Sequence, residues 1–309
     1  MDILLQQIIN GLVLGSMYAL IALGYTMVYG IIQLINFAHG EVLMVGVLTS
    51  WSIIGLMQEA MPGVPGWVIL LIATLIACVV AAVLNYTIEK LAYRPLRNSP
   101  RLAPLITAIG MSILLQTLAM IIWKPNYKPY PTLLPAEPFD IAGAVITPTQ
   151  IMVLVTTAVV LVILLYLVNY TRLGRAMRAT AEKPRVAALM GIKPDMVISA
   201  TFIIGAVLAA IAGVMWASNY GTAQHTMGFL PGLKAFIAAV FGGIGNLAGA
   251  VVGAMILGLV EAIGAGYIGE WTGGVLGSQY VDIFSFIVLI IVLTLRPSGL
   301  LGERVADRA

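Results

Sequence analysis

Nine apolar segments dominate this chain, and most of them are long enough to cross a lipid bilayer as helices. A spanning helix needs about 20 mostly apolar residues because the hydrocarbon core is about 30 Å thick. Membrane barrel strands would instead alternate apolar and polar residues over about 10 positions, and the segments show no such alternation. We therefore expect an all-α polytopic membrane protein with about eight spans, within a range of about seven to nine. The segments cover residues 8–32, 34–57, 67–89, 102–122, 150–168, 197–217, 233–244, 247–268 and 281–296.

Composition and termini agree with a single membrane domain over residues 1–309. Hydrophobic residues make up 61% of the chain and charged residues 9%, whereas soluble domains carry about 25% charged residues. The single Cys78 and two distant histidines predict neither disulfides nor a metal cluster. The start is acidic and no Ala-x-Ala cleavage pattern follows, so the first segment is expected to remain as a span. The net charge of +3 comes from residues beside the spans, so no nucleic-acid partner is expected.

Basic residues gather in some loops and avoid others, which predicts how the chain sits in the membrane. Lys and Arg favour the cytoplasmic side of short connecting loops. The loops at 90–101 and 169–196 and the C-terminal tail are therefore expected in the cytoplasm. Their basic residues are Lys90, Arg94, Arg97, Arg101, Arg172, Arg175, Arg178, Lys183, Arg185, Lys193, Arg296, Arg304 and Arg308.

The remaining loops carry few basic residues and are expected outside. They cover residues 58–66, 123–149, 218–232 and 269–280. Tryptophan favours the membrane–water interface, and all five tryptophans fall at or near these external ends. Residues 1–89 contain no Lys or Arg, so the N-terminus is placed outside only by counting spans back from Lys90.

Two polar interruptions inside apolar runs are the candidates for a path through the membrane. Residues 8–57 would form a helix of about 75 Å, so this run must turn near residues 36–41. A second break at 242–246 leaves 233–244 too short to span. Unwound backbone survives in a membrane only where it is buried in protein or lines a cavity. The residues predicted to line the path are Asn36, His39, Gly40, Glu41, Gly243 and Gly245; the alternative is that both breaks are ordinary tight turns.

The two breaks also occupy corresponding places in the two halves of the chain. Each is followed by an apolar segment, a Trp-bearing external loop, another apolar segment and a basic stretch. This order suggests a weak two-fold internal repeat, and matched interruptions of this kind point to a transporter pathway.

Small residues recur at four-residue spacing, which lets helices approach each other closely. Three such ridges predict tight packing within the chain or between subunits: Gly11, Gly15 and Ala19; Gly205, Ala209 and Gly213; Gly245, Gly249 and Gly253.

Carboxylates inside the apolar segments are notable because a charge in the membrane centre costs about 3 kcal/mol or more. Glu41 follows His39 by two residues, so one break could hold both; equally, both could lie at the cytoplasmic interface, where the cost is small. Glu261 lies within the segment 247–268, and Asp282 is expected just outside the membrane.

Motifs for covalent chemistry are missing from the sequence. It contains no Gly-x-x-x-x-Gly-Lys-Ser/Thr phosphate loop, Gly-x-Ser-x-Gly elbow, His-Glu-x-x-His zinc helix or paired catalytic carboxylates. A Gly-x-Gly-x-x-Gly pattern at 264–269 closes an apolar span with no strand before it, so it predicts no dinucleotide site. We expect a membrane path rather than an enzyme, with no cofactor bound by this chain.

The cytoplasmic loop after Val168 predicts ordered structure. Arg172, Arg175 and Arg178 recur every three residues, so on a helix they lie near one face that can meet anionic head groups. A short helix is expected over 184–190, with Pro at its start and Gly191 just past its end. Its apolar face is either a knob that docks into a soluble partner or a surface helix lying on the membrane. That face consists of Val186, Leu189 and Met190.

Several motifs resemble the permease subunits of branched-chain amino-acid ABC importers, and most closely the shorter, H-type subunit. The resemblance covers essentially the whole chain. It is carried by GSMYAL at 15–20, GYTMVYG at 24–30, INFAHGE at 35–41, AYRPLR at 92–97, LGRA at 173–176, KAF at 234–236, GGIG at 242–245 and RPSGLLG at 296–302.

This resemblance implies a multi-pass protein of the bacterial inner membrane that translocates leucine, isoleucine and valine. It implies a heterodimer with a second related permease, two ATPase subunits that bind ATP and Mg, and a periplasmic solute-binding protein. The helix 184–190 would be the coupling helix seated in an ATPase, with Arg178, Glu182, Val186, Leu189 and Gly191 as coupling residues. The chain departs from the Glu-Ala-Ala-x-x-x-Gly pattern of many ABC permeases, since Lys-Pro follows Glu182.

Two other functions fit parts of the sequence. A related ABC permease could carry urea, short amides or another small solute. A secondary transporter could use Glu41 and Glu261 as proton or cation sites.

Overall fold

The computed structural model describes residues 2–97, 99–100, 102–135, 137–141, 143–277, 280–296 and 298–302. The predicted basic residues Arg101, Arg304 and Arg308, and Pro297 of the closing motif, lie outside the described residues. Seven described helices are long and apolar enough to cross a membrane, which confirms the all-α polytopic fold. They are α1 (Asp2–Ile32), α2 (His39–Ala60), α3 (Gly66–Ile88), α4 (Leu102–Trp123), α5 (Pro148–Tyr170), α8 (Pro194–Tyr220) and α10 (Leu247–Trp271).

Two further apolar helices are too short to span and correspond to the predicted segments 233–244 and 281–296. They are α9 (Phe229–Gly242) and α11 (Asp282–Leu295). Beyond its last turn α3 continues as a π-helix, η1 (Glu89–Tyr93), and a 3₁₀ turn, η2 (Arg94–Leu96). Segments of π-helix are rare and occur frequently at functional sites.

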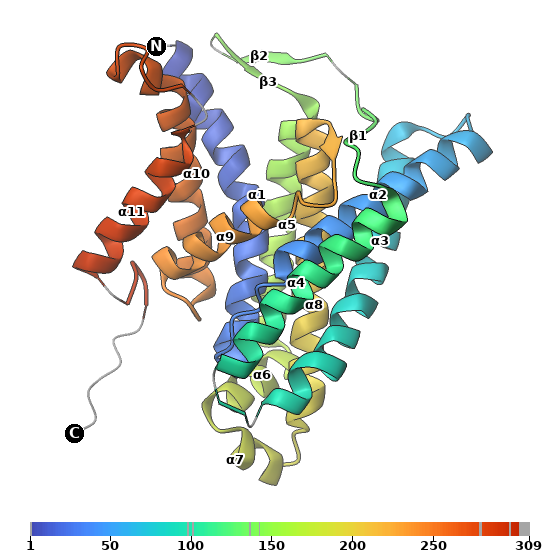
Figure 1. Ribbon diagram of the computed structural model, residues 1–309, viewed down its shortest axis with the longest axis vertical. Helices are drawn as coiled ribbons and strands as arrows, with labels where there is room; N and C mark the ends of the chain where they lie inside the picture. The colour runs from blue at the N-terminus through green and yellow to red at the C-terminus, as the bar shows by residue number, and fades with distance from the viewer. Residues whose placement is uncertain are drawn as a thin grey trace.

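The two ends of the molecule differ in structure. The N-terminus and the hairpin of β2 (Phe139–Ile141) and β3 (Ala144–Ile146) lie at one end, and α6 (Arg172–Glu182) and α7 (Pro184–Leu189) lie at the other (Figure 1). The basic loops at 90–97 and 169–196 meet at the α7 end, where Arg97 forms an ion pair with Asp195. The cytoplasmic identity of this end stays a prediction from the charge pattern.

A small sheet ties together the loops at the opposite end. Strand β1 (Lys128–Pro129) pairs antiparallel with β4 (Thr222–Ala223). Next to this sheet the Tyr130 hydroxyl lies 2.9 Å from Ser50 Oγ. Burial raises the pKa of Tyr130 to about 12, so the phenol keeps its proton at physiological pH.

The first predicted break is a return of the chain into the interior. After Ile32 the chain turns at Gln33, which has a φ of 52°, and residues 33–36 have no regular structure. Helix α2 then begins at His39, whose imidazole occupies the space beside Gly24. Gly24 lies eight residues, or about 12 Å, before the end of α1. The start of α2 is therefore well inside the bundle.

The second half contains a corresponding return, but its place differs from the prediction. After β4, residues 224–228 lead inward and α9 begins at Phe229. A Cβ on Gly232 of α9 would lie 2.9 Å from the Cα of Gly40, so the starts of α2 and α9 meet. The structural counterpart of the first break is thus 224–228 rather than 242–246.

The break at 242–246 is the turn between α9 and α10, at the opposite end of α9. It lies near the end of α1, where a Cβ on Gly30 would be 3.7 Å from the Gly245 carbonyl oxygen. The turn passes through left-handed backbone at Gly243 and Gly245, with φ of 109° and 98°, which glycine adopts without strain.

The predicted small-residue ridges lie at helix–helix contacts. A Cβ on Gly15 of α1 would be 2.9 Å from Met255 Cα of α10, and one on Gly213 of α8 would be 2.9 Å from the Leu43 carbonyl oxygen of α2. Close packing of this kind confirms the prediction for these ridges and brings α1 against α10 and α8 against α2.

We predict that Gly15→Val separates α1 from α10 and lowers the stability of the folded chain by about 1–3 kcal/mol, as overpacking does. Thermal unfolding in detergent, followed by size-exclusion chromatography, measures the effect. Gly55→Val is the matched control, since nothing lies within 4 Å of a Cβ at that position of α2. Equal unfolding temperatures for the two variants would contradict this account of the contact.

Candidate functional site

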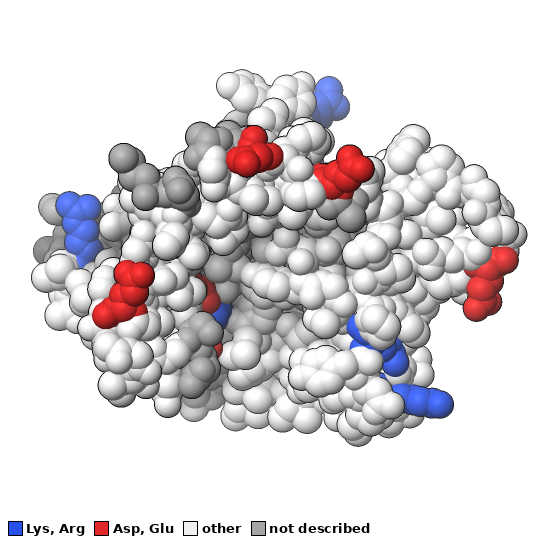
Figure 2. Space-filling view, turned by 90° about the horizontal axis from the view of Figure 1, so that it is seen from above, with Lys and Arg blue, Asp and Glu red and all other residues white. Residues whose placement is uncertain are grey.

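A cavity of about 780 Å³ lies where α2 and α9 begin. Its walls come from α1, α4, the end of α8, the loop 222–228 and α9. Gly40, Gly228 and Gly232 contribute to its lining, so both interior helix starts border it. Seen from the end that carries the N-terminus, the molecule is hollowed and its surface is sparsely charged (Figure 2). The helix starts and the cavity together form the candidate translocation site.

Glu41 lies directly behind one wall of this cavity. The residue is 1% exposed, and its Oε1 accepts hydrogen bonds from Ser112 Oγ at 3.0 Å and Gln116 Nε2 at 2.7 Å. Ser112 and Gln116 lie in the middle of α4 and line the cavity themselves. Of the two positions that the sequence left open for Glu41, the structure has the interior one.

Asn36 and His39 hold the returning chain in place. Asn36 Oδ1 accepts hydrogen bonds from the Tyr93 hydroxyl at 2.7 Å and from the Ala38 amide at 3.1 Å. His39 is 1% exposed and packs edge-to-face on Tyr25, with ring centroids 4.7 Å apart. Of the four residues predicted at this break, Gly40 alone lines the cavity. A role of Asn36 and His39 in a substrate path stays a prediction.

Gly243 and Gly245 do not line the cavity. Instead, the C-terminal segment packs on their turn, with the Leu300 and Leu301 amides each 2.9 Å from the carbonyl oxygens of Phe241 and Gly242. Asn246 Nδ2 donates to the Leu301 carbonyl at 2.9 Å. The position of the turn therefore offers no support for the predicted pathway role of these two glycines.

An ion cluster in the cavity wall was not predicted from the sequence. Lys234 of α9 forms ion pairs with Glu261 of α10 and with Asp282 of α11, the latter at 2.6 Å. The Tyr18 hydroxyl donates to Glu261 Oε2 at 3.0 Å. The sequence feature that could have indicated this cluster is Lys234, a lysine inside the apolar segment 233–244.

Asp282 was expected just outside the membrane, and its depth in the membrane stays a prediction. Through Lys234 and Glu261 it joins Tyr18, which lies halfway along α1. The ammonium of Lys234 compensates the charge of the Asp282 carboxylate.

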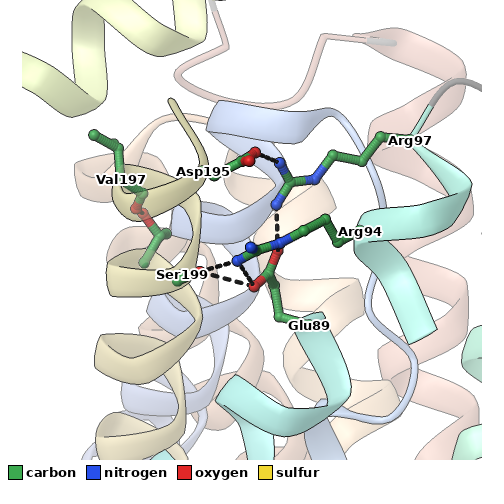
Figure 3. Close-up of polar contacts among 7 residues, drawn as sticks. Glu89, Arg94, Arg97, Asp195, Val197 and Ser199 are labelled. Carbon is green, nitrogen blue, oxygen red and sulfur yellow. Dashed lines mark hydrogen bonds and ion pairs between the residues drawn. The ribbon is translucent and has the colours of Figure 1, made fainter. Parts of the chain in front are cut away.

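A second polar cluster joins the loops at the α7 end (Figure 3). Glu89 is completely buried and accepts from Arg94 Nη2 at 2.9 Å, from Arg97, and from Ser199 Oγ at 2.8 Å. Arg97 also forms an ion pair with Asp195 in the first turn of α8. The cluster links the end of α3 to the start of α8. In the sequence its arginines were topology signals and part of the AYRPLR motif, with no indication of their partners.

Helix α7 confirms the short helix expected after Glu182. Pro184 begins it, Leu189 ends it, and Gly191 follows with a φ of 85°. Ala187 is buried, whereas Val186 is 51% exposed and Leu189 87% exposed. Large apolar side chains on a helix that projects from the end of the molecule are typical of a docking surface.

The two residues predicted beside α7 face different surroundings. Arg178 of α6 donates to the carbonyl of Val168 at the end of α5. Glu182 lines a second cavity of about 1060 Å³, together with the end of α1, Arg94, Arg97 and the start of α7. The cavity thus borders both the end of α1 and the start of α7.

Comparisons with known proteins match nearly the whole chain. Residues 7–293 match the family described as branched-chain amino acid transport system / permease component. The chain is 46% identical over 304 residues to BraD of Pseudomonas aeruginosa, a high-affinity branched-chain amino acid transport system permease protein, covering 97% of this chain and 96% of BraD. It is 44% identical to the corresponding LivH of Escherichia coli with the same coverage. A more distant relative, the fructose import permease protein FruG of Bifidobacterium longum, is 26% identical over 80% of this chain and 73% of its own length.

We predict that Glu89→Gln destabilises the α7 end by about 3 kcal/mol, in the range for a broken buried ion pair. The substitution leaves Arg94 and Arg97 without their shared carboxylate. Hydrogen exchange of residues 89–97 and 194–200 measures the change. Glu59→Gln, on the exposed end of α2, is the control, and equal exchange in the two variants would contradict the assignment.

Proposed function

The chain belongs to the branched-chain amino-acid transport permease family, and on that premise we propose that it is the membrane-spanning permease subunit of an ATP-binding-cassette importer. Its cargo is leucine, isoleucine and valine, which a periplasmic binding protein delivers. The chain is a multi-pass membrane protein and a transport subunit, and it works in the bacterial inner membrane. ATP and Mg bind to two partner ATPases, and a second related permease completes the pathway.

Helix α7 is the proposed contact with the ATPase. The observation that carries this assignment is its exposed apolar surface, which combines Val186, Leu189 and Met190 at 51%, 87% and 80% exposure. A cleft in a soluble partner would remove that surface from water, which favours association by about 25 cal/mol for each Å². The membrane-surface alternative uses the same apolar side chains, and the test below separates the two.

A continuous series of contacts leads from α7 to the candidate translocation site. Helix α8 begins at Pro194, shortly after α7, and its first turns hold Asp195 and Ser199. These residues bind the Arg97, Arg94 and Glu89 cluster at the end of α3.

The π-helix that carries Glu89 also carries Tyr93, whose hydroxyl binds Asn36 in the returning chain. A shift of α7 is thereby connected through packed polar groups to the start of α2. In this proposal the helices alternate between an arrangement open to the outside and one open to the cytoplasm. The two arrangements must differ in free energy, and ATP binding on the partner supplies that difference.

Cargo identity rests on the relatives. BraD and LivH are named for branched-chain amino acids, and their identity to this chain is 46% and 44%. FruG is named for fructose import at 26% identity, so distant relatives carry other solutes. Urea, amides and other small solutes are the alternative cargoes, and an uptake assay with the cognate binding protein distinguishes them.

We predict that Val186→Asp combined with Leu189→Asp uncouples ATP hydrolysis from uptake while the permease pair still assembles. The charges disfavour burial in the ATPase cleft. Radiolabelled leucine uptake and ATP hydrolysis by the reconstituted complex are measured together. Leu301→Asp serves as a position control, because Leu301 is an exposed apolar residue outside α7.

Undiminished coupled uptake by the double variant would refute the docking assignment. Loss of membrane insertion, with intact ATPase binding, would instead support a surface helix. A secondary transporter would move leucine without partners, so the purified permease in liposomes with an ion gradient is assayed as well; we expect no transport there.

We predict that Asn36→Ala and Glu41→Ala lower leucine uptake by at least tenfold and reduce assembly far less. The first removes the acceptor for Tyr93 and the second removes the acceptor for Ser112 and Gln116. Uptake for each assembled complex is measured after quantifying the permease. Normal uptake would assign these residues to an ordinary turn.

A further inference from the structure

The ion cluster in the cavity wall has features of a ligand site. Lys234 and Asp282 both line the 780 Å³ cavity, whereas Glu261 does not. Side-chain exposures follow the same order, with 44% for Asp282, 13% for Lys234 and 7% for Glu261. One carboxylate is therefore behind the lysine and the other lies beside it on the cavity surface.

Each member of the cluster has a different set of partners. Glu261 binds Lys234 and also accepts from the Tyr18 hydroxyl at 3.0 Å and from Ser285 Oγ at 3.5 Å. These contacts come from α1, α9 and α11. Glu261 is thus fixed by several elements, and its ion pair holds Lys234 in the cavity wall.

Asp282 has fewer constraints. Its ion pair with Lys234 measures 2.6 Å, and it lies in the first turn of α11 with nearly half its surface exposed. The formal charge of the three residues together is negative, with two carboxylates and one ammonium. Asp282 can therefore accept a second cation without leaving Lys234 unpaired, because Glu261 remains in place.

The rest of the cavity suits an apolar side chain next to these charges. Aromatic rings of Tyr18 and Trp216 pack together with centroids 5.8 Å apart, and both line the cavity. Ile109 and Ile113 of α4 and Leu233 of α9 also line the cavity. A mainly apolar wall with a few convergent charged groups is typical of a small-molecule site.

We propose that Lys234 and Asp282 form a subsite for a zwitterion in the cavity wall, where Lys234 takes the α-carboxylate and Asp282 the α-ammonium of an apolar amino acid. The proposal rests on the proposed function and names the residues that receive the cargo inside the membrane. The zwitterion inserts between two charges that bind each other when the site is empty. Its own charges replace that pairing, so the membrane interior holds no unpaired charge at either stage.

Uptake by the complete importer tests this subsite. The complex is reconstituted with its ATPases, second permease and binding protein, and radiolabelled leucine uptake is divided by the amount of assembled complex. We expect Lys234→Gln and Asp282→Asn to lower uptake at least tenfold, and Lys234→Arg to retain more uptake than Lys234→Gln. Glu270→Gln is the matched control, because Glu270 is an exposed carboxylate of α10 that does not line the cavity.

A second measurement separates a ligand site from a clamp between helices. Thr226 is exposed and lines the cavity, so Thr226→Cys in a Cys78→Ala background reports access through its rate of labelling by a membrane-impermeant thiol reagent. In the vanadate-trapped complex we expect leucine to slow labelling at least threefold. Leucinamide and 4-methylpentanoate, which lack one charge each, should protect less. Asp282→Asn should abolish the protection by leucine.

The outcomes are distinguishable. Wild-type uptake per complex in Lys234→Gln and Asp282→Asn would overturn the subsite, as would lost uptake with leucine protection unchanged in Asp282→Asn. A fall in assembly alone, with uptake per complex unchanged, would show that the cluster only holds helices together. That result would also overturn the proposed subsite. If the wild-type importer moves no leucine, the proposed function itself fails.

Discussion

The contact between the start of α2 and the start of α9 is the constraint on which the rest of the arrangement depends. A helix start leaves its first backbone N–H groups without partners inside the helix, and hydrocarbon supplies none. Both starts must therefore be buried in protein. Gly40 meets Gly228 and Gly232 so closely that a Cβ would not fit, and Tyr25 of α1 lies beside Gly232. The cavity borders this contact because the unwound segments end there.

The same constraint explains the polar groups around the returning chain. Asn36 closes the turn through the Ala38 amide and connects it to Tyr93. Glu41 lies one turn later, and its Oε1 accepts hydrogen bonds from two donors of α4, while its Oε2 has no partner among the described residues. These contacts join the first break to α3 and α4, so a displacement of either helix changes the environment of the α2 start. The polar cluster around Glu89 extends this connection to the base of α8 and to α7 (Figure 3).

Two ion clusters within the helical bundle join charges from different elements. Glu89 has two arginines, and Lys234 has two carboxylates. Buried pairs add little net stability compared with apolar packing, yet removal of one partner is costly. Such pairs therefore specify which helices lie together. They also leave a cavity surface with both signs of charge and an apolar wall, which suits a zwitterionic solute.

The number and type of spanning helices followed from the sequence because the thickness of the bilayer sets the length of apolar segment that a span needs, and that length is a local property of the chain. The 184–190 helix and the small-residue ridges were equally visible, since Pro, Gly and four-residue spacing act locally. The sequence also identified 36–41 as a break. Its depth was decided by tertiary structure, because only the packing of His39 beside Gly24 shows how far the chain returns. The same holds for Lys234, Glu261 and Asp282, which lie on three helices. A charge in an apolar segment is visible in the sequence, but its partner is chosen by the way helices distant along the chain pack together.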